Sequence, residues 1–488
     1  ERANLFIVPL DEERRWYRYH HLFADLLHQR QRQLRPEQLP TLHLKASAWY
    51  EQNGFMDETI DHALRAEDFE RAAGLMEEQF DVTWQTGEHS KLWRWLEGLP
   101  ERTVLAKPDL CVFYARSLYA RGQQDAAEHY LQVAEQALSV DAEDPTGARL
   151  AQQGLSHPLD RPRLQGRIAV TRALLAFFYG DVSAMVRHAR QALAYLPERD
   201  SAWRSNAAIA LGDAHRIQGD LEAAYRARLE ALETSKAAGN VYMILVASMK
   251  LAVTMRQQGR LEQAWQLCQE QLQLAGESGL SQTALAGGFL AIGGEILAEL
   301  DDLKEALRRA EKGLERAECG EDVVVLGWSY LCLIRILLTR GDWFGAEQLF
   351  RRVRARSRES DLPPWIARMM AAWQVRLWLA QGRLEAASRW ASEREADVAQ
   401  EPEFLREFEG IVLARTWMAQ GRLDDAATLL QRLLQAAETG YRISNAIEIL
   451  VLQSLALEAE GETDQAISAL TQALNRAEPG GFVRTFVD

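Results

Sequence analysis

Residues 301–317 read DDLKEALRRAEKGLERA, and the pattern in this stretch decides the fold. Asp301 stands five positions before Ala306, and from Leu303 onward small and apolar residues recur at i, i+3, i+4, i+7, i+11 and i+14. This is the spacing of one face of an amphipathic helix. The residues that mark it are Leu303, Ala306, Leu307, Ala310, Leu314 and Ala317.

The same start of a helix recurs along the chain as Gly-x-x-x-x-Ala. Asp301 takes the Gly position once, and Met185 once replaces Ala; from Gly180 onward the Gly positions follow one another at 39, 40, 42, 40, 41, 39 and 40 residues. Glycine in the left-handed conformation ends one helix, and alanine lets the next helix cross it closely. The Gly positions are 122, 180, 219, 259, 341, 382, 421 and 461.

Each repeat is therefore expected to be a helical hairpin, and neighbouring hairpins must stack to bury their apolar faces. The sequence predicts an all-α, tetratricopeptide-like superhelix over residues 167–478, with first helical repeats over 39–138. Residues 139–166 contain several Pro and Gly residues between two helical patterns, so we expect an exposed loop there.

The first residues have a different pattern. Residues 4–10 and 15–20 have the composition of two strands, and a helix is expected from about His21. This β-hairpin and helix, residues 1–38, are too small for a domain. We expect them to be the end of one, and the chain, which begins with Glu1, to be part of a longer polypeptide.

Composition argues against several function classes. The 56 Lys and Arg face 70 Asp and Glu, giving a net charge of −14, which is unlike a surface adapted to nucleic acid or to anionic membranes. The four cysteines are far apart and include no C-x-x-C pair, so they are expected to be buried apolar residues in the reducing cytoplasm. No metal and no cofactor are expected in this chain.

Four stretches resemble one bacterial family, the MalT-like large ATP-dependent regulators of the LuxR type. They are NLFIVPLDEERRWYRYHHLFADLL at 4–27, LHLKASAWYEQNGFMDETIDHALRAEDFERAAGLME at 42–77, LWRWLEGLPERTVLAKPDLCVFYARSLYARGQQDAAEHYL at 92–131 and EPGGFVRTFVD at 478–488. The resemblance implies a winged-helix end followed by a helical-repeat sensor, between an ATPase and a DNA-binding helix-turn-helix.

The resemblance also limits the function of this chain. It contains no G-x-x-x-x-G-K-[ST] phosphate loop, so ATP is expected only in the ATPase part of the parent protein. Residues 479–488 are expected to begin a linker to the DNA-binding domain. The chain is then a sensing and docking module of a transcriptional activator, without direct contact to nucleic acid or membrane, whose partners are the ATPase and DNA-binding domains.

Catalysis is not expected, because the sequence shows no nucleophile elbow, metal-binding His pair or triad motif. The adjacent His20 and His21 are interpreted as packing residues. Arg14, Arg15 and Arg18 alternate with aromatic residues, and three interpretations stay open: contact with the ATPase arm, contact with DNA, and solvated strand faces.

The resemblance implies that the residue six positions before each repeat's Gly faces the concave groove. Three successive repeats place an arginine there, which could bind a carboxylate or phosphate, or form a ladder of structural salt bridges. The tryptophans nearby, Trp328 among them, could stack on a ligand or fill gaps between helices. The groove positions are Asp213, Val253, Glu295, Arg335, Arg376, Arg415 and Leu455.

Two functions remain possible at this point. In one, an unidentified inducer or partner, expected to be anionic, binds the groove and shifts the parent ATPase toward its active state. In the other, the groove is a scaffold for a peptide or helix of a partner protein, without a small-molecule inducer.

Overall fold

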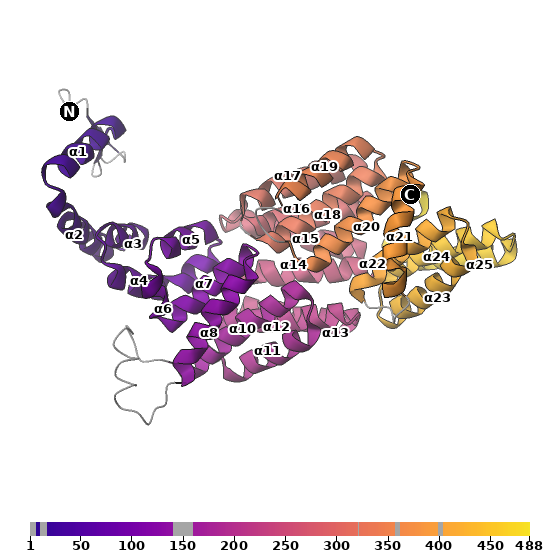
Figure 1. Ribbon diagram of the computed structural model, residues 1–488, viewed down its shortest axis with the longest axis horizontal. Coiled ribbons are helices and arrows are strands. Elements are labelled where there is room, and N and C mark those ends of the chain that lie inside the picture. The colour runs from indigo at the N-terminus through magenta and orange to yellow at the C-terminus, as the bar shows by residue number, and fades with distance from the viewer. Residues whose placement is uncertain (1–5, 10–16, 140–159, 321, 357–361, 399–403) are drawn as a thin grey trace. The chain divides into compact units, whose positions relative to one another are not determined.

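The computed structural model describes residues 6–9, 17–139, 160–320, 322–356, 362–398 and 404–488 (Figure 1). The chain divides into two compact units. The first unit comprises residues 1–80 and 93–106, and the second comprises residues 81–92 and 107–488. Both are helical, and the only strands in the described part of the chain are β1 (Ile7–Pro9) and β2 (Tyr17–Tyr19).

These two strands form an antiparallel pair in which Val8 lies opposite Arg18, as the sequence predicted for a β-hairpin. Helix α1 (His21–Leu34) follows directly, and ring stacking of Phe6 on Phe23, with centroids 4.5 Å apart, packs the first strand on this helix. The expected turn at residues 11 and 12 lies outside the described residues.

The first unit continues with short helices. Ser47 and Ile60 are buried where α2 packs on α3, and Trp95 is buried on α5. These helices are η1 (Pro36–Gln38), α2 (Leu39–Gln52), α3 (Met56–Arg65), α4 (Phe69–Gln85), α5 (His89–Glu97) and α6 (Glu101–Leu105), with α4 and α5 crossing the boundary between the units.

The second unit is the array of helical hairpins. Its helices are α7 (Pro108–Ala120), α8 (Gln124–Ser139), α10 (Arg161–Tyr179), α11 (Val182–Tyr195), α12 (Ser201–Ile217), α13 (Leu221–Ala237), α14 (Val241–Gln257), α15 (Leu261–Glu277), α16 (Ala284–Glu299), α17 (Leu303–Cys319), α18 (Val323–Thr339), α19 (Trp343–Arg356), α20 (Pro364–Ala380), α21 (Leu384–Val398), α22 (Phe404–Ala419), α23 (Leu423–Thr439), α24 (Ile443–Ala459), α25 (Thr463–Ala477), η2 (Glu478–Gly480) and α26 (Arg484–Val487).

The repeat register read from the sequence is confirmed. All nine Gly positions, including the one held by Asp301, have positive φ between 71° and 87°. The residues five positions later are fully buried, apart from Ala466 with 4% of its surface exposed. The left-handed residue ends the first helix of each pair, and the small side chain faces the crossing.

The array turns so that early and late repeats touch. The backbone N–H of Leu221 donates to the carbonyl of Gly440 (3.3 Å), and Nη1 of Arg442 donates to the carbonyl of Gly219 (2.8 Å). One helical pair further along, Oγ of Ser444 donates to the carbonyl of Arg256 (2.6 Å). These contacts enclose the inner faces of the first helices of the hairpins.

One expected boundary and one cysteine need correction. Residues 140–159 lie outside the described residues, but α10 begins at Arg161 and buries Leu164, so the end of the expected loop is helical. Asp160 caps this helix by accepting the N–H of Arg163, a start signal that the nearby prolines concealed. Cys319 is exposed at the end of its helix, while the other cysteines are buried as expected.

Candidate ligand cavity

A cavity of about 650 Å³ lies on the inner face of the second unit. It is lined mainly by the first helices of successive hairpins, α16, α18, α20, α22 and α24. Its charged side chains are Arg216, Arg256, Arg335, Arg376, Arg415, Arg484, Glu295, Glu299, Glu448 and Asp488, and its aromatic side chains are Trp328, Trp343, Trp365, Trp373, Phe404, Phe408 and Phe482.

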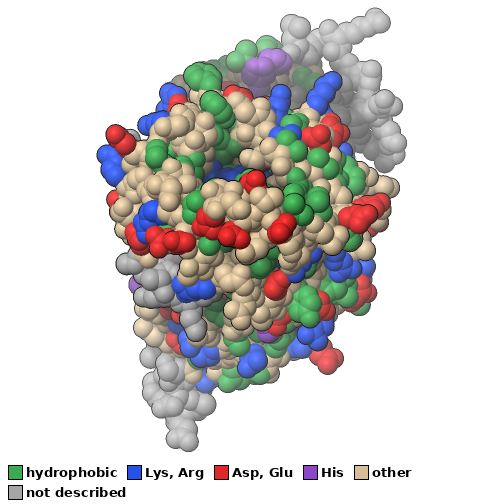
Figure 2. Space-filling model, turned by 90° about the vertical axis from the view of Figure 1, so that its right-hand side faces the viewer, with side chains coloured by type: hydrophobic (Ala, Val, Ile, Leu, Met, Phe, Trp, Pro, Cys, Tyr) green, Lys and Arg blue, Asp and Glu red, His purple; other side chains and the backbone are tan. Residues whose placement is uncertain are grey.

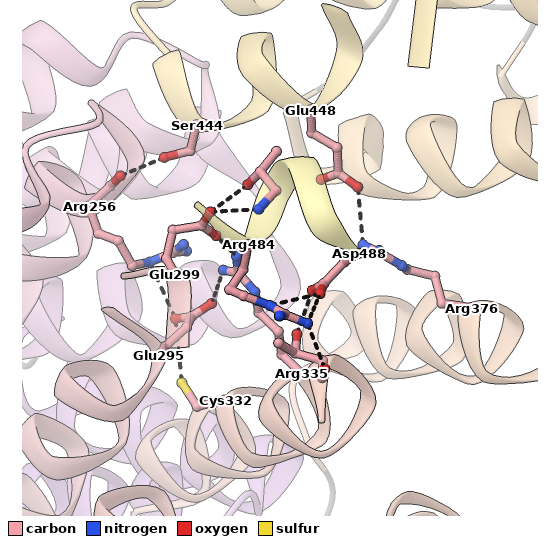
Figure 3. A network of polar contacts seen from close by, with 12 residues as sticks. Arg256, Glu295, Glu299, Cys332, Arg335, Arg376, Ser444, Glu448, Arg484 and Asp488 are labelled. Atoms are coloured by element: carbon pink, nitrogen blue, oxygen red, sulfur yellow. Dashed lines mark hydrogen bonds and ion pairs between the residues drawn. The ribbon is translucent and has the colours of Figure 1, made fainter. Parts of the chain in front are cut away.

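The three groove arginines predicted from the sequence line this one cavity, together with Glu295 and Trp328. Arg335 is bound by two acids of α16, with 2.9 Å from its Nη1 to Oε1 of Glu295 and 2.5 Å from its Nη2 to Oε2 of Glu299 (Figure 3). Burial alone would raise the pKa of Glu295, but the charges of Arg256 and Arg335 outweigh it and hold that pKa below its usual range. This carboxylate is therefore ionised and already paired.

The other two arginines share one acid. Nη1 of Arg376 and Nη2 of Arg415 each lie 3.0 Å from Oε1 of Glu448 on α24. Burial, and then the charge of Arg415, lower the pKa of Arg376 to about 10, so this guanidinium stays charged at neutral pH. Nε of Arg415 is buried and has no hydrogen-bond partner among the described residues. On this side of the cavity one carboxylate is hydrogen-bonded to two cations.

The last residues of the chain form part of the cavity wall, in the contacts that Figure 3 shows around Glu299 and Arg484. The backbone N–H and Oγ1 of Thr485 donate to Oε1 of Glu299 (2.9 and 2.7 Å), and Arg484 donates to the carbonyl of Thr339 (3.0 Å). Residues 479–488, which we expected to begin a linker, thus pack into the array through Arg484 and Thr485. Phe482, buried against the core, anchors them.

Asp213 does not belong to this cavity, although it occupies the same repeat position. Its carboxylate binds Nη2 of Arg228 (2.5 Å) and Nζ of Lys250 (2.9 Å) and lines a smaller cavity nearer the start of the array. Trp328 lines both cavities. The groove is therefore divided, because the closing of the array separates the early repeats from the late ones.

Sequence reasoning missed the acids that pair with the arginines. Glu299 follows Glu295 by four residues, and Glu448 precedes Leu455 by seven, so both lie on the groove face of their helices by helical periodicity. A search of the whole groove face, one and two turns from the chosen position, would have found them. Arg484 carried no such signal, because its segment lies outside the repeat.

The predicted docking arginines cannot be placed at this site. Arg14 and Arg15 lie outside the described residues, and only the backbone of Arg18 is described, paired with Val8 in the hairpin. The His20 and His21 rings stack on each other, with centroids 4.3 Å apart. Among the described residues, no group of three or more His, Cys, Asp or Glu is arranged to hold a metal, and no helix is long and apolar enough to cross a membrane.

On the face that Figure 2 shows, charges of both signs are present. Figure 2 shows one face of the molecule, where acidic side chains form a band and basic ones lie scattered around it.

Comparison with known proteins gives matches along the whole chain. A family model described as the MalT-like TPR region matches residues 166–488, and one described as the MalT winged helix domain matches residues 1–39. The HTH-type transcriptional regulators MalT of Yersinia pestis (strain Pestoides F) and Yersinia enterocolitica serotype O:8 / biotype 1B are each 25% identical to the chain, over 495 and 492 residues. Each alignment covers 100% of this chain and 52% of the relative, so the chain spans about half the length of the curated relatives it matches.

Two solved structures share the fold at low identity. The Rap protein complexed with Competence and Sporulation Factor aligns with a TM-score of 0.53 and 13% identity, over 76% of this chain and 98% of that one. The APC/C hetero-tetramer Cut9–Hcn1 aligns with a TM-score of 0.51 and 12% identity, over 93% of this chain and 86% of that one. With the repeat register, the hairpin and a family match over more than half of its residues, the chain belongs to the family of the MalT-like TPR region.

Proposed function

We propose that this chain is the ligand-sensing and docking region of a cytoplasmic HTH-type transcriptional regulator, and that an anionic ligand in the arginine cavity sets its state. The ATPase and DNA-binding parts implied by the resemblance would respond to that state, and the chain itself would catalyse no reaction. The family match and the regulator names of the relatives support the regulatory role.

The observation that carries the anionic ligand is the charge of the cavity. Among the residues that line it, six arginines face four acids, in a protein whose net charge is −14. Buried cations without counter-charge are costly, and an ionised ligand would supply what the side chains lack. The two-to-one pairing of Arg376 and Arg415 with Glu448 marks the place where the charge is missing.

The arrangement also suits recognition by shape. Arginine binds carboxylate or phosphate through two parallel N–H donors, and the surrounding tryptophans offer flat apolar surface for the rest of the ligand. The guanidinium of Arg376 lies over the ring of Trp373, 4.8 Å from its centroid, which holds the fork in position before a ligand arrives. Preorganised donors reduce the entropy lost on binding.

A second candidate is the binding of a partner segment, favoured by one observation. Residues 482–488 form part of the cavity wall, through Phe482, Thr485 and Arg484, which supports the binding of a further polypeptide segment beside them. The structural neighbour solved with Competence and Sporulation Factor is named as a complex with such a binding partner. An acidic peptide would satisfy the same excess of positive charge.

The experiment is a thermal-shift screen of the 488-residue chain against metabolites grouped in pairs, each carboxylate or phosphate with its neutral ester or amide. Any hit is then measured by titration calorimetry on the wild type and on Arg415→Gln. We expect the hits to be the anionic members and the variant to bind at least tenfold more weakly, because a charge-assisted hydrogen bond contributes about 1.5–3 kcal/mol.

Arg308→Gln is the matched control, because Arg308 is exposed and, among the described residues, pairs only with Glu305 of its own helix. It should bind like the wild type. Stabilisation by the neutral members alone, or equal affinity of Arg415→Gln, would contradict the proposed function. A peptide partner would instead appear as stabilisation by acidic peptides and by no small anion.

A further inference from the structure

A second cavity, of about 140 Å³, lies within the same unit, and Arg216 is the one charged residue that it shares with the larger cavity. It is formed by α7, α10, α12, α14, α16 and α18 together with residues 84 and 89. Its walls include the aromatic side chains of Trp84, Tyr119, Phe177, Tyr242, Trp328 and Trp365.

Arg116 on α7 is the unusual residue of this cavity. Its guanidinium lies between the rings of Trp84 and Trp203, 4.3 and 4.5 Å from their centroids, and only 5% of the residue is exposed. It makes no hydrogen bond and no ion pair with the described residues, and its Nε is buried without a partner. Asp81, whose charge reaches it, is already bound by Arg167 (2.5 Å).

Arg216 on α12 is in a similar position. It too is 5% exposed, and its described contacts are with the faces of Trp365 and Phe404, 5.7 and 5.4 Å from the ring centroids. Burial lowers the pKa of both Arg116 and Arg216 to about 10, which still leaves both charged at neutral pH. Two guanidiniums are thus held beside this cavity without a hydrogen-bonded acid.

The acids nearby do not supply the missing charge. Asp213 is shared by Arg228 and Lys250, and Asp322 accepts the N–H groups of Val324 and Val325 at the start of α18. The lining therefore holds four cations and two acids. Burial lowers the pKa of His89 to about 4, so this ring is neutral and adds no charge.

We propose that this smaller cavity binds a small aromatic carboxylate, about the size of benzoate, with its carboxylate on Arg116 and its ring against the aromatic walls. The volume fits, since an apolar cavity of about 150 Å³ in another protein holds benzene. The stacked guanidinium of Arg116 presents its fork in a fixed plane, as bidentate binding of a carboxylate requires. The site is separate from the three groove arginines and does not depend on their ligand.

The experiment is titration calorimetry of the whole chain with benzoate, and with benzyl alcohol as the neutral ligand of similar size. Two variants change the site in different ways. Arg116→Met removes the charge and keeps the stack between the tryptophans, and Val253→Phe fills the cavity and keeps every charge. We expect benzoate to bind the wild type, benzyl alcohol at least tenfold more weakly, and both variants to lose at least tenfold in affinity for benzoate.

Arg116→Met has a second expected effect, which a purely structural arginine would not show. Because Arg116 forms no ion pair with the described residues, its removal should leave the melting temperature of the free chain unchanged or higher. Arg415→Gln, in the larger cavity, is the control and should bind benzoate within twofold of the wild type. This control distinguishes the two cavities, because benzoate should bind the smaller cavity even if no anion binds the larger one.

No benzoate binding at millimolar concentration, equal binding of benzyl alcohol, or unchanged affinity in both variants would overturn the proposal. So would loss of benzoate binding in Arg415→Gln alone, because it would place the anion in the larger cavity.

Discussion

Nη2 of Arg415 donates a hydrogen bond of 3.0 Å to Oε1 of Glu448, which joins α22 to α24 across the larger cavity. Arg376 binds the same oxygen atom from α20, so one carboxylate holds three hairpins together. The arrangement contains the salt-bridge ladder that the sequence left as one alternative, and we propose that it is also the anion site. Glu448 holds both arginines in place, but its single negative charge does not neutralise two guanidiniums.

Glu448→Gln tests this reading. The change leaves two buried guanidiniums without an acid, and breaking a buried ion pair costs about 3 kcal/mol or more. We expect a lower free energy of unfolding in urea, and a larger stabilisation by added pyrophosphate than in the wild type. Glu438→Gln is the control, because the Glu438–Arg476 pair is largely exposed and should contribute less than about 1 kcal/mol. An equal loss of unfolding free energy in both variants would show that Glu448 contributes no more than the Glu438–Arg476 pair does.

The buried alanines of the repeats are a second target. Ala306→Leu or Ala387→Leu inserts three carbon atoms where no surface is exposed, and overpacking should destabilise the array by about 1–3 kcal/mol. Ala126→Leu, at an exposed helix position, should change little. Denaturation midpoints measure the difference, and an unchanged midpoint in both buried variants would mean that these crossings are looser than the structure shows.

A third target is the crossing of α16 and α17, where glycine replaces the usual small side chain. A Cβ atom at Gly294 would lie 2.8 Å from the carbonyl oxygen of Ala306, whereas at Gly276 no atom lies within 4 Å. Gly→Ala in an open helix position gains up to about 1 kcal/mol. We therefore expect Gly276→Ala to raise the melting temperature and Gly294→Ala to lower it. The same sign for both would refute the close crossing.

The repeat fold could be predicted from the sequence because the glycine and alanine positions determine local structure. Each fixes one turn and one crossing, and nine such pairs determine the register without knowledge of the rest. Helix α10 shows the limit: Asp160 starts it among prolines and glycines that favoured a loop.

The site could be predicted only in part. The period brought Arg335, Arg376 and Arg415 into one cavity, as expected. Asp213 shares their repeat position and lies elsewhere, because contacts such as Arg442 with Gly219, 223 residues apart, close the array and divide its inner face. Contacts between repeats that are far apart in the sequence cannot be predicted from the spacing of the repeats.

A fourth prediction concerns pH. Burial and then the charge of Arg116 lower the pKa of His89 to about 4, against 6.5 in the unfolded chain. Between these values the unfolded chain binds more protons, so this group's contribution is complete above pH 6.5 and is lost as the pH falls toward 4, by at most about 3 kcal/mol. The difference in unfolding free energy between the wild type and His89→Gln should shrink from pH 7 to pH 5. A constant difference would mean that His89 titrates normally.

The central claim is that the larger cavity holds an excess of positive charge that a ligand neutralises. Its most direct test is the salt-corrected affinity of the 488-residue chain for pyrophosphate, measured by calorimetry on the wild type, Arg376→Gln, Arg415→Gln and the exposed control Arg308→Gln. We predict binding by the wild type and by Arg308→Gln, and at least tenfold weaker binding by both cavity variants, with melting temperatures close to that of the wild type. Absence of binding by the wild type, or equal affinity in all four proteins, would contradict the account.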